Sequence, residues 1–409
     1  MRCWLFVLAA CTSAPSLELQ ESDYEQALRA QERALVGLQR RAEAQSTSPT
    51  AWTNLAEGYR SHAALTGSLR GYVDALSAVE RASAISPELA AGSRAALLFS
   101  VHRLEDAASQ IEIALARPLL PEGERAELLG LRGEIRLHQG NLIAARADLD
   151  EAFALRGTMA NAFRLALWHW HRGEFEDAEG WVDAAEAALP RRIPRAFSWL
   201  DLQRGLLDWD RGRAFEALAH YDDAEAHFSG DWLVAEHRAE ALALLGEHAR
   251  AEAIYREVVV RTGDPALTDA LASLLEAQGR DQEARALVRD AQAGFDADLA
   301  LLPSAAGGHA IDFALRHHSP DAISLAAADY AFRPGGAQAV KFAQAELQRG
   351  RTAAARELLR AAEETSYRHA ELWETAAYVA DAEGRTDDAN SHRAHARRIN
   401  PHVDLSHLP

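Results

Sequence analysis

The groups in this sequence best suited to chemistry are its seventeen histidines, several of which stand near acidic residues. The arrangement closest to a metal site is Asp388, His392 and His395, whose i, i+4 and i+7 spacing places three possible ligands on one helical face. A solvated polar face explains the same spacing. A metal site also needs outer groups that orient its ligands, and this stretch shows no such groups. We therefore predict no metal site here.

Other arrangements that catalysis requires are also missing from the sequence. The pairs His169 with His171 and His317 with His318 are too close in sequence to share a helix face. There is no phosphate-cradling glycine loop, no nucleophile elbow and no pair of cysteines at zinc spacing. We predict a protein without catalytic activity and without a cofactor. The alternative is a metal-binding or enzymatic protein that uses its histidines.

The bulk composition favours a folded, all-helical protein that does not bind nucleic acid. Of the 409 residues, 48% are hydrophobic and 25% are charged, which is ordinary for a globular chain. Alanine, the best helix former, dominates the apolar residues. The formal net charge of −18 argues against binding the phosphate backbone of DNA or RNA. Lysine occurs once, at Lys341, and the excess of arginine is most simply explained by a GC-rich coding bias.

The first residues, Met-Arg-Cys-Trp-Leu-Phe-Val-Leu-Ala-Ala-Cys, have the layout of an export signal. A positive charge at Arg2 precedes an apolar run that is too short to span a bilayer. The sequence from Leu8 to Cys11 resembles the lipobox of bacterial lipoproteins, in which the cysteine is acylated and the preceding peptide is removed. The resemblance implies a signal peptide over residues 1–10, a lipid on Cys11 and a tether over residues 11–22. The implied location is the bacterial cell envelope, on the periplasmic side of the outer membrane, and the alternative is the cytoplasm.

Most of the remaining chain repeats with a period near 34 residues. One alanine recurs at intervals of 32 to 39 residues, at Ala75, Ala107, Ala145, Ala178, Ala217, Ala251, Ala284, Ala322, Ala355 and Ala389. Glycines that can end a helix stand five residues earlier, at Gly140, Gly173, Gly212, Gly246, Gly279, Gly350 and Gly384. Twelve residues before each alanine, from the second unit onward, the residue is alanine or glycine. The pattern predicts two helices per unit that approach each other closely.

These features resemble the tetratricopeptide repeat, a helix-turn-helix unit with a small residue in each helix. The first unit matches best, through Trp52, Leu55, Ala56, Tyr59, Ala75, Ala82 and Pro87. The unit around Ala322 departs most, because it has Ser319-Pro320 at its turn and Asp329 where alanine is usual. A helical bundle or long coiled coil would lack a glycine stop in every unit. The resemblance implies an all-α, right-handed α-solenoid of about ten repeats.

The predicted organisation is therefore a capping helix or half-repeat over residues 23–46, a solenoid over residues 49–402 and a tail over residues 403–409. In such an array each unit is expected to contact only its neighbours, and an extended concave groove binds a partner. The resembling family lines this groove mainly with the first helix of each unit. Projecting that face gives Phe99, Phe163, Leu167, Trp170, Leu202, Leu206, Trp209, Glu236, Glu240, Asp269 and Glu276. This implies a scaffold or adaptor whose partner is a protein or peptide with an apolar segment and basic residues.

Overall fold

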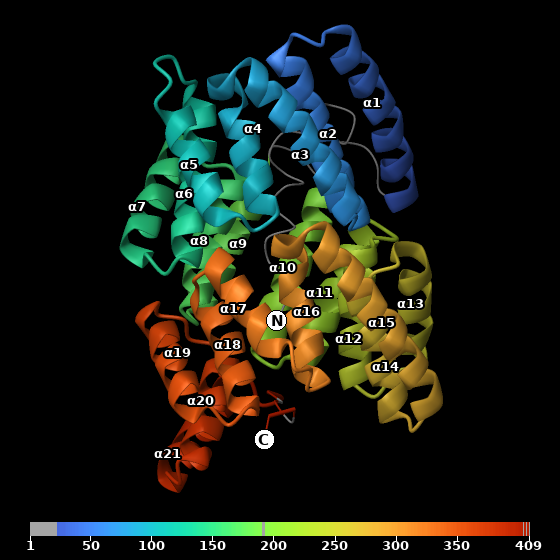
Figure 1. Cartoon of the computed structure of the whole chain (residues 1–409), viewed down its shortest axis with the longest axis vertical. Helices are drawn as coiled ribbons and strands as arrows, with labels where there is room; N and C mark the ends of the chain where they lie inside the picture. The colour runs from blue at the N-terminus through green and yellow to red at the C-terminus, as the bar shows by residue number, and fades with distance from the viewer. Residues whose placement is uncertain (1–22, 190–192, 404, 406, 409) are drawn as a thin grey trace.

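The computed structural model describes residues 23–189, 193–403, 405, 407 and 408. The predicted signal peptide, Cys11 and the tether lie outside these residues. Within them the regular secondary structure is helical (Figure 1). The one strand-like contact among the described residues is a bridge between Asp23 and Ser229. The helices are α1 (Tyr24–Ala44), α2 (Pro49–Thr66), α3 (Leu69–Ile85), α4 (Pro87–Ser100), α5 (Leu104–Leu115), α6 (Glu122–His138), α7 (Leu142–Leu155), α8 (Met159–His171), α9 (Phe175–Ala187), α10 (Pro194–Asp210), α11 (Ala214–His227), α12 (Trp232–Leu244), α13 (His248–Thr262), α14 (Pro265–Ala277), α15 (Asp281–Leu301), α16 (Pro303–Arg316), α17 (Ala322–Phe332), α18 (Gly336–Gln348), α19 (Thr352–Glu364), α20 (Ala370–Ala382) and α21 (Thr386–Ile399).

After α1, the described helices form ten pairs, from α2 with α3 to α20 with α21. The ten recurring alanines all lie in the second helix of a pair, and each is buried. They are buried because the first helix of the same pair presents its own small residue at the crossing. A Cβ atom at Gly133 in α6, for example, would lie 2.7 Å from the side chain of Leu149 in α7. The prediction of an all-α solenoid of about ten helix pairs is confirmed.

The seven repeated glycines end the first helix of their pairs in the left-handed conformation that the sequence predicted. In the second pair, His102 occupies the corresponding position with a φ of 63°. A side chain other than glycine is unusual in this region, and it persists where the surrounding structure holds it. The His102 side chain is fully buried, so its contacts explain why glycine is absent at this position.

The solenoid winds back on itself, so that α17 to α20 lie below α5 to α8 (Figure 1). Hydrogen bonds join residues that are 191 to 203 positions apart in the sequence. The Ser304 hydroxyl donates to the carbonyl of Val101 over 2.6 Å, and Nδ1 of His102 bonds to the carbonyl of Ser304 over 3.1 Å. Each contact links one helix pair to a pair five or six units later. We call this set of contacts the seam.

Helix ends explain the chemistry of the seam. The last carbonyl groups of an α-helix have no i+4 partner within that helix, so they can accept hydrogen bonds from the turn that follows and from other helices. At the end of α8, His369 Nε2 bonds to the carbonyl of Trp170 over 3.0 Å, and the backbone N–H of Arg368 donates to the carbonyl of His171 over 3.2 Å. At the end of α10, Asn400 Nδ2 donates to the carbonyl of Trp209 over 3.3 Å.

The expectation that each unit contacts only its neighbours is therefore wrong for this protein. The small rotation from one pair to the next accumulates along the array, and pairs five or six units apart come into contact. The N-terminal end is also joined to a later pair, since the Tyr24 backbone N–H donates to the carbonyl of Ser229 and the Trp232 indole donates to the carbonyl of Leu65, each over 2.9 Å. None of the described helices combines the length and apolar character that crossing a bilayer requires.

Candidate functional site

Two cavities lie inside the solenoid, with walls that come mainly from the first helices of the pairs. Cavity 1, of about 510 Å³, is bordered by α10, α12, α16 and the turn between α2 and α3. Cavity 2, of about 660 Å³, is bordered by the ends of α8 and α10 and by α12, α14, α16, α18 and α20. Glu236, Ala266, Phe295 and His309 line both cavities. The cavities therefore adjoin, and we call them together the channel.

Cavity 1 has a mainly apolar wall. Helix α10 contributes Trp199, Leu202 and Leu206, which lie three or four residues apart and so share one helix face. Phe295 from α15 lies in the same wall. Amid these apolar groups, α10 also presents the buried amide of Gln203.

Cavity 2 is polar, and carboxylates outnumber permanent cations in its wall. The carboxylates are those of Asp210, Glu236, Glu240, Asp269, Asp312, Asp329 and Glu371, and the permanent cations are those of Arg316, Arg333 and Lys341. Each of the three cations pairs with at least one of these carboxylates. An excess of negative charge in a cavity of low dielectric is unfavourable unless a cation compensates it.

The only lysine of the chain joins three successive pairs inside cavity 2. Lys341 of α18 places Nζ 2.9 Å from the Asp312 carboxylate of α16 and 3.5 Å from the Glu371 carboxylate of α20. Burial acts to lower the pKa of Lys341, but the attraction of the two carboxylates outweighs it and raises the pKa. Burial likewise opposes ionisation of Asp312, yet the charge of Lys341 holds the pKa of that carboxyl below its usual range. The group therefore stays ionised.

The unit that departs most from the repeat also contributes charges to cavity 2. Asp329, found where alanine is usual, accepts two hydrogen bonds of 2.6 and 2.7 Å from one guanidinium nitrogen of Arg333. Both side chains are buried. In α14, Asp269 accepts from Arg316 over 2.6 Å and lies 2.8 Å from Nε2 of His317. Ion pairs thus account for the departures of this region from the apolar pattern.

The structure brings most of the predicted groove residues to the channel. Cavity 1 is lined by Leu202, Leu206 and Glu236, and cavity 2 by Leu167, Trp170, Trp209, Glu236, Glu240 and Asp269. Phe99 and Phe163 are instead buried among core residues and line neither cavity, and Glu276 is exposed outside the channel. That the predicted residues bind a partner stays a prediction.

Trp170 has a structural contribution that its sequence position did not reveal. Its side chain is 1% exposed, and its indole donates to the Asp210 carboxylate over 2.9 Å. Trp209, by contrast, is half-buried. Projection of a helix face gives the direction of a side chain, but it does not give the depth to which neighbouring pairs bury it.

The residues that sequence reasoning missed are Lys341 with its two carboxylates and the amide of Gln203. The single lysine was visible as a compositional exception, which we attributed to coding bias. Its partners, Asp312 and Glu371, come from different units, so no local spacing connects the three residues. Gln203 lies between apolar residues in the sequence and has no motif around it.

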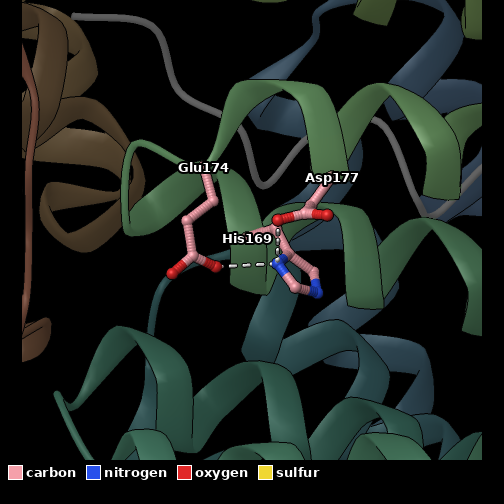
Figure 2. A group of neighbouring side chains, drawn as sticks. All are labelled: His169, Glu174 and Asp177. Carbon is pink, nitrogen blue, oxygen red and sulfur yellow. Dashed lines mark hydrogen bonds and ion pairs between the residues drawn. The ribbon is translucent and has the colours of Figure 1, made fainter.

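His169, Glu174 and Asp177 are the one group among the described residues with three possible metal ligands close together (Figure 2). Nδ1 of His169 lies 2.8 Å from Glu174 and 3.8 Å from Asp177. Glu174 also accepts from Arg172 over 2.7 Å, and Nε2 of His169 lies 3.4 Å from a guanidinium nitrogen of Arg146. Hydrogen bonding accounts for this group, and two neighbouring arginines disfavour a metal cation.

The arrangement considered from the sequence, Asp388 with His392 and His395, has other contacts. Asp388 accepts from Arg385 over 2.6 Å, and the rings of both histidines pack against Trp373, with centroids 5.8 and 4.3 Å away. These three residues do not form a possible metal group in the described part of the chain.

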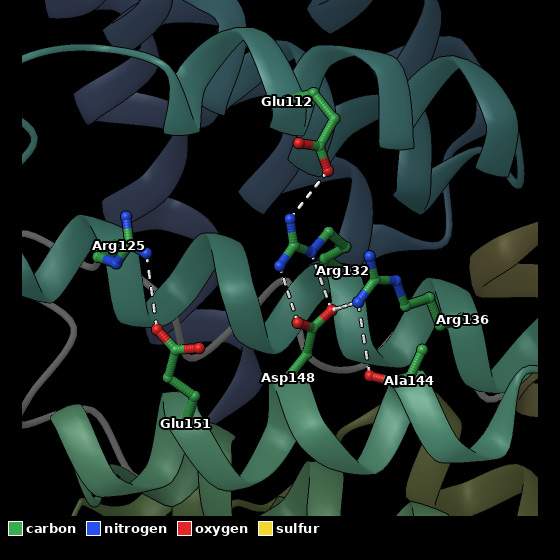
Figure 3. Close-up of polar contacts among 7 residues, drawn as sticks. All are labelled: Glu112, Arg125, Arg132, Arg136, Ala144, Asp148 and Glu151. Carbon is green, nitrogen blue, oxygen red and sulfur yellow. Dashed lines mark hydrogen bonds and ion pairs between the residues drawn. The ribbon is translucent and has the colours of Figure 1, made fainter.

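A polar cluster on α6 and α7 has a structural role (Figure 3). Asp148 of α7 accepts two hydrogen bonds of 2.8 and 2.9 Å from Arg132 and one of 2.5 Å from Arg136, both on α6. The hydrogen bond to Asp148 is the main factor that raises the pKa of Arg132. None of these three side chains lines the channel, so the cluster stabilises the helix pair.

The helix pairs and the interior channel define an α-solenoid built from helix-turn-helix repeats. Residues 93–160 and 202–267 match the family model of the tetratricopeptide repeat. These two segments therefore contain tetratricopeptide repeats, and the helix pairs of the other described residues have the same architecture. No curated protein matches the sequence.

Many solved structures are similar to the chain, and three of them illustrate the degree of similarity. A tetratricopeptide-repeat protein from Parabacteroides merdae has 16% identity over 58% of this chain and 93% of its own, with a TM-score of 0.41. PilF from Pseudomonas aeruginosa has 17% identity over 53% of this chain and 96% of its own, with a TM-score of 0.37. Naa15/Naa10 bound to HypK-THB has 17% identity over 93% of this chain and 62% of its own, with a TM-score of 0.32. Similarity this low supports no conclusion about the function of this chain.

Proposed function

We propose that this protein is a non-catalytic scaffold that binds an apolar segment with basic residues, contributed by a protein partner, inside its channel. We also propose that a lipid on Cys11 holds it at a bacterial envelope membrane. The observation that supports the first proposal most strongly is the excess of carboxylates in the wall of cavity 2, next to the apolar wall of cavity 1.

Charge complementarity selects the chemistry of the partner. A lysine or arginine side chain that enters cavity 2 compensates the excess negative charge, and its stem packs against the apolar and aromatic wall. The position of Lys341 supports this mode of binding, because its ammonium lies between two carboxylates from different pairs. An apolar neighbour of the basic residue then reaches cavity 1, since Glu236 borders both cavities.

Defined peptides test the channel. We expect an acetylated, amidated peptide of leucine and arginine to bind, and a leucine and glutamate peptide of the same length not to bind. The double change Glu236→Gln and Glu240→Gln is expected to weaken binding by about ten-fold or more, because it removes two negative charges near the ligand. Glu276→Gln is the matched control, since Glu276 is exposed outside the channel. Equal binding of both peptides, or equal loss in the control, would refute the proposed partner chemistry.

The membrane proposal depends on Cys11 and has its own experiment. In a bacterial host, we expect the natural protein to fractionate with membranes and Cys11→Ser to be soluble or unprocessed. Cys3→Ser is the control, since Cys3 lies before the predicted cleavage position. A processed Cys11→Ser protein that stays with the membrane would exclude lipidation. A natural protein found only in the cytoplasm would favour a cytoplasmic scaffold.

A further inference from the structure

Two buried hydrogen-bond donors in the wall of cavity 1 have no hydrogen-bond partner among the described residues. They are Nε2 of Gln203, whose residue is 2% exposed, and the indole Nε1 of Trp199, whose residue is 7% exposed. Both residues belong to α10 and both line cavity 1. They are four positions apart, so they lie one turn apart on the same face of the helix.

Unpaired donors at this depth are unfavourable for folding alone. The large majority of buried side-chain polar atoms in proteins have a partner, because a buried group without one loses its bond to water and gains nothing in return. The apolar neighbours Leu202 and Leu206 would pack equally well against leucine at position 203. The Trp199 ring contacts Phe163 with centroids 4.4 Å apart, a contact that phenylalanine at position 199 would keep. Core packing therefore does not explain the polar atoms.

We infer that cavity 1 binds an apolar group that carries a neutral oxygen acceptor, and that Gln203 and Trp199 donate hydrogen bonds to this acceptor. The inference rests on the proposed function: the ligand is an apolar side chain of the partner segment together with a main-chain carbonyl beside it. The basic residue next to it then enters cavity 2 along the wall that Glu236 shares.

The charges of cavity 1 favour a neutral acceptor over a carboxylate. Its wall contains the acidic side chains of Asp231, Glu236, Asp264 and Asp298 in addition to Arg70 and Arg195. Burial raises the pKa of Asp298, as does the nearby charge of Asp264. Because acidic side chains outnumber the arginines, this wall repels a further anion, whereas a peptide carbonyl brings oxygen lone pairs without net charge.

Access to the donors requires only a local movement. The Gln203 nitrogen is covered by neighbouring atoms, and its amide group lies at the end of a side chain that lines the cavity. The last torsion of glutamine is soft, so the amide can rotate to present its N–H groups to a ligand. The Trp199 indole is fixed by its ring contacts and supplies a second donor one turn away.

Gln203→Leu and Trp199→Phe distinguish binding from a structural role. For each variant we expect an unchanged or higher melting temperature, because an unpaired buried donor is removed, and about a ten-fold weaker affinity for the acetylated leucine and arginine peptide. Asn161→Leu is the matched control: Asn161 is also buried, but its amide donates to the carbonyls of Ala152 and Arg156 over 3.2 and 2.9 Å outside the channel. That variant should melt earlier and bind the peptide normally.

Two small probes separate failure of this inference from failure of the proposed function. Hexanamide offers an apolar chain with a neutral oxygen acceptor, and hexanoate offers the same chain with a carboxylate. Binding of hexanamide that Gln203→Leu abolishes supports the donor site even if no peptide binds, in which case only the proposed function fails. Preference for hexanoate would overturn the neutral-acceptor assignment. A fall in the melting temperature of Gln203→Leu with unchanged affinity for every probe would overturn the site itself.

Discussion

A disulfide across the seam provides the most direct test of the solenoid's closure. Gly140 follows α6 and Thr365 follows α19, and they are far apart in sequence. A Cβ atom at Gly140 would lie 3.1 Å from Cβ of Thr365, and the nearest clash is with a methyl group that cysteine lacks. A disulfide places Cβ atoms about 3.5–4.5 Å apart, so a shift of a few tenths of an ångström suffices. We expect Gly140→Cys with Thr365→Cys to form a disulfide readily.

The expected stabilisation follows from the length of the loop that the disulfide closes. For a loop of roughly 225 residues, the loss of entropy in the unfolded chain amounts to about 5 kcal/mol in favour of the folded state. Gly140 has a φ of 77°, so cysteine there is strained by about 1–2 kcal/mol. This strain is present in both redox states of the same variant. Comparing the oxidised with the reduced protein therefore isolates the effect of the cross-link.

Urea unfolding of the oxidised and reduced forms measures this difference. With Cys3 and Cys11 replaced by serine, we expect oxidation to raise the midpoint by on the order of 1–2 M. The control pair, Gly140→Cys with Thr352→Cys, uses the opposite end of α19, which is about 20 Å away along the helix, and should not cross-link. Failure of the first pair to cross-link, or cross-linking without a change in midpoint, would refute the seam as a folded-state contact.

Three further predictions concern buried side chains. Trp170→Ala should lose about 3–5 kcal/mol of stability in urea unfolding because it empties a core position, whereas the half-buried Trp209→Ala should lose less and mainly weaken peptide binding. Burial lowers the pKa of His171 to about 4. The free energy of unfolding is therefore not reduced by this residue above pH 6.5, and it falls by about 1.4 kcal/mol per pH unit as the pH drops toward 4. His171→Gln should reduce this dependence of stability on pH. Lys341→Met should cost about 3–5 kcal/mol, because two buried carboxylates lose their cation, and an unchanged unfolding midpoint would contradict the ion-pair assignment.

The pairing of helices within each unit could be predicted from the sequence because the same pattern of small residues occurs in every repeat. The alanine in each second helix and the small residue in each first helix report one close crossing, and a glycine reports the turn between them. Chance agreement at one unit is plausible, but agreement over ten units is not. Helix pairing depends on residues within one period of about 34 residues, so it can be predicted from local sequence patterns.

The seam could not be predicted because no local pattern encodes it. Its position depends on a small rotation repeated over six pairs, and a small error in each rotation would place different residues together. The channel has the same origin. Sequence projection identified the face of Leu202, Leu206 and Glu236, but it could not show that later pairs close over that face. The buried donors of Gln203 and Trp199 become visible only when the surrounding atoms are placed.

The residues that depart from the repeat also indicate where distant units are in contact. A repeat position that packs only within its own pair favours the common residue, so a costly exception needs a contact outside the pair. His102 replaces a turn glycine and adopts a positive φ, and its ring bonds to the carbonyl of Ser304 six pairs later. Asp329 replaces a small residue, and its partner Arg333 lies close enough to His102 and His138 to lower the pKa of both, after the larger effect of burial. Exceptions in a regular array therefore mark where distant units meet, and in this chain they mark the seam that encloses the channel.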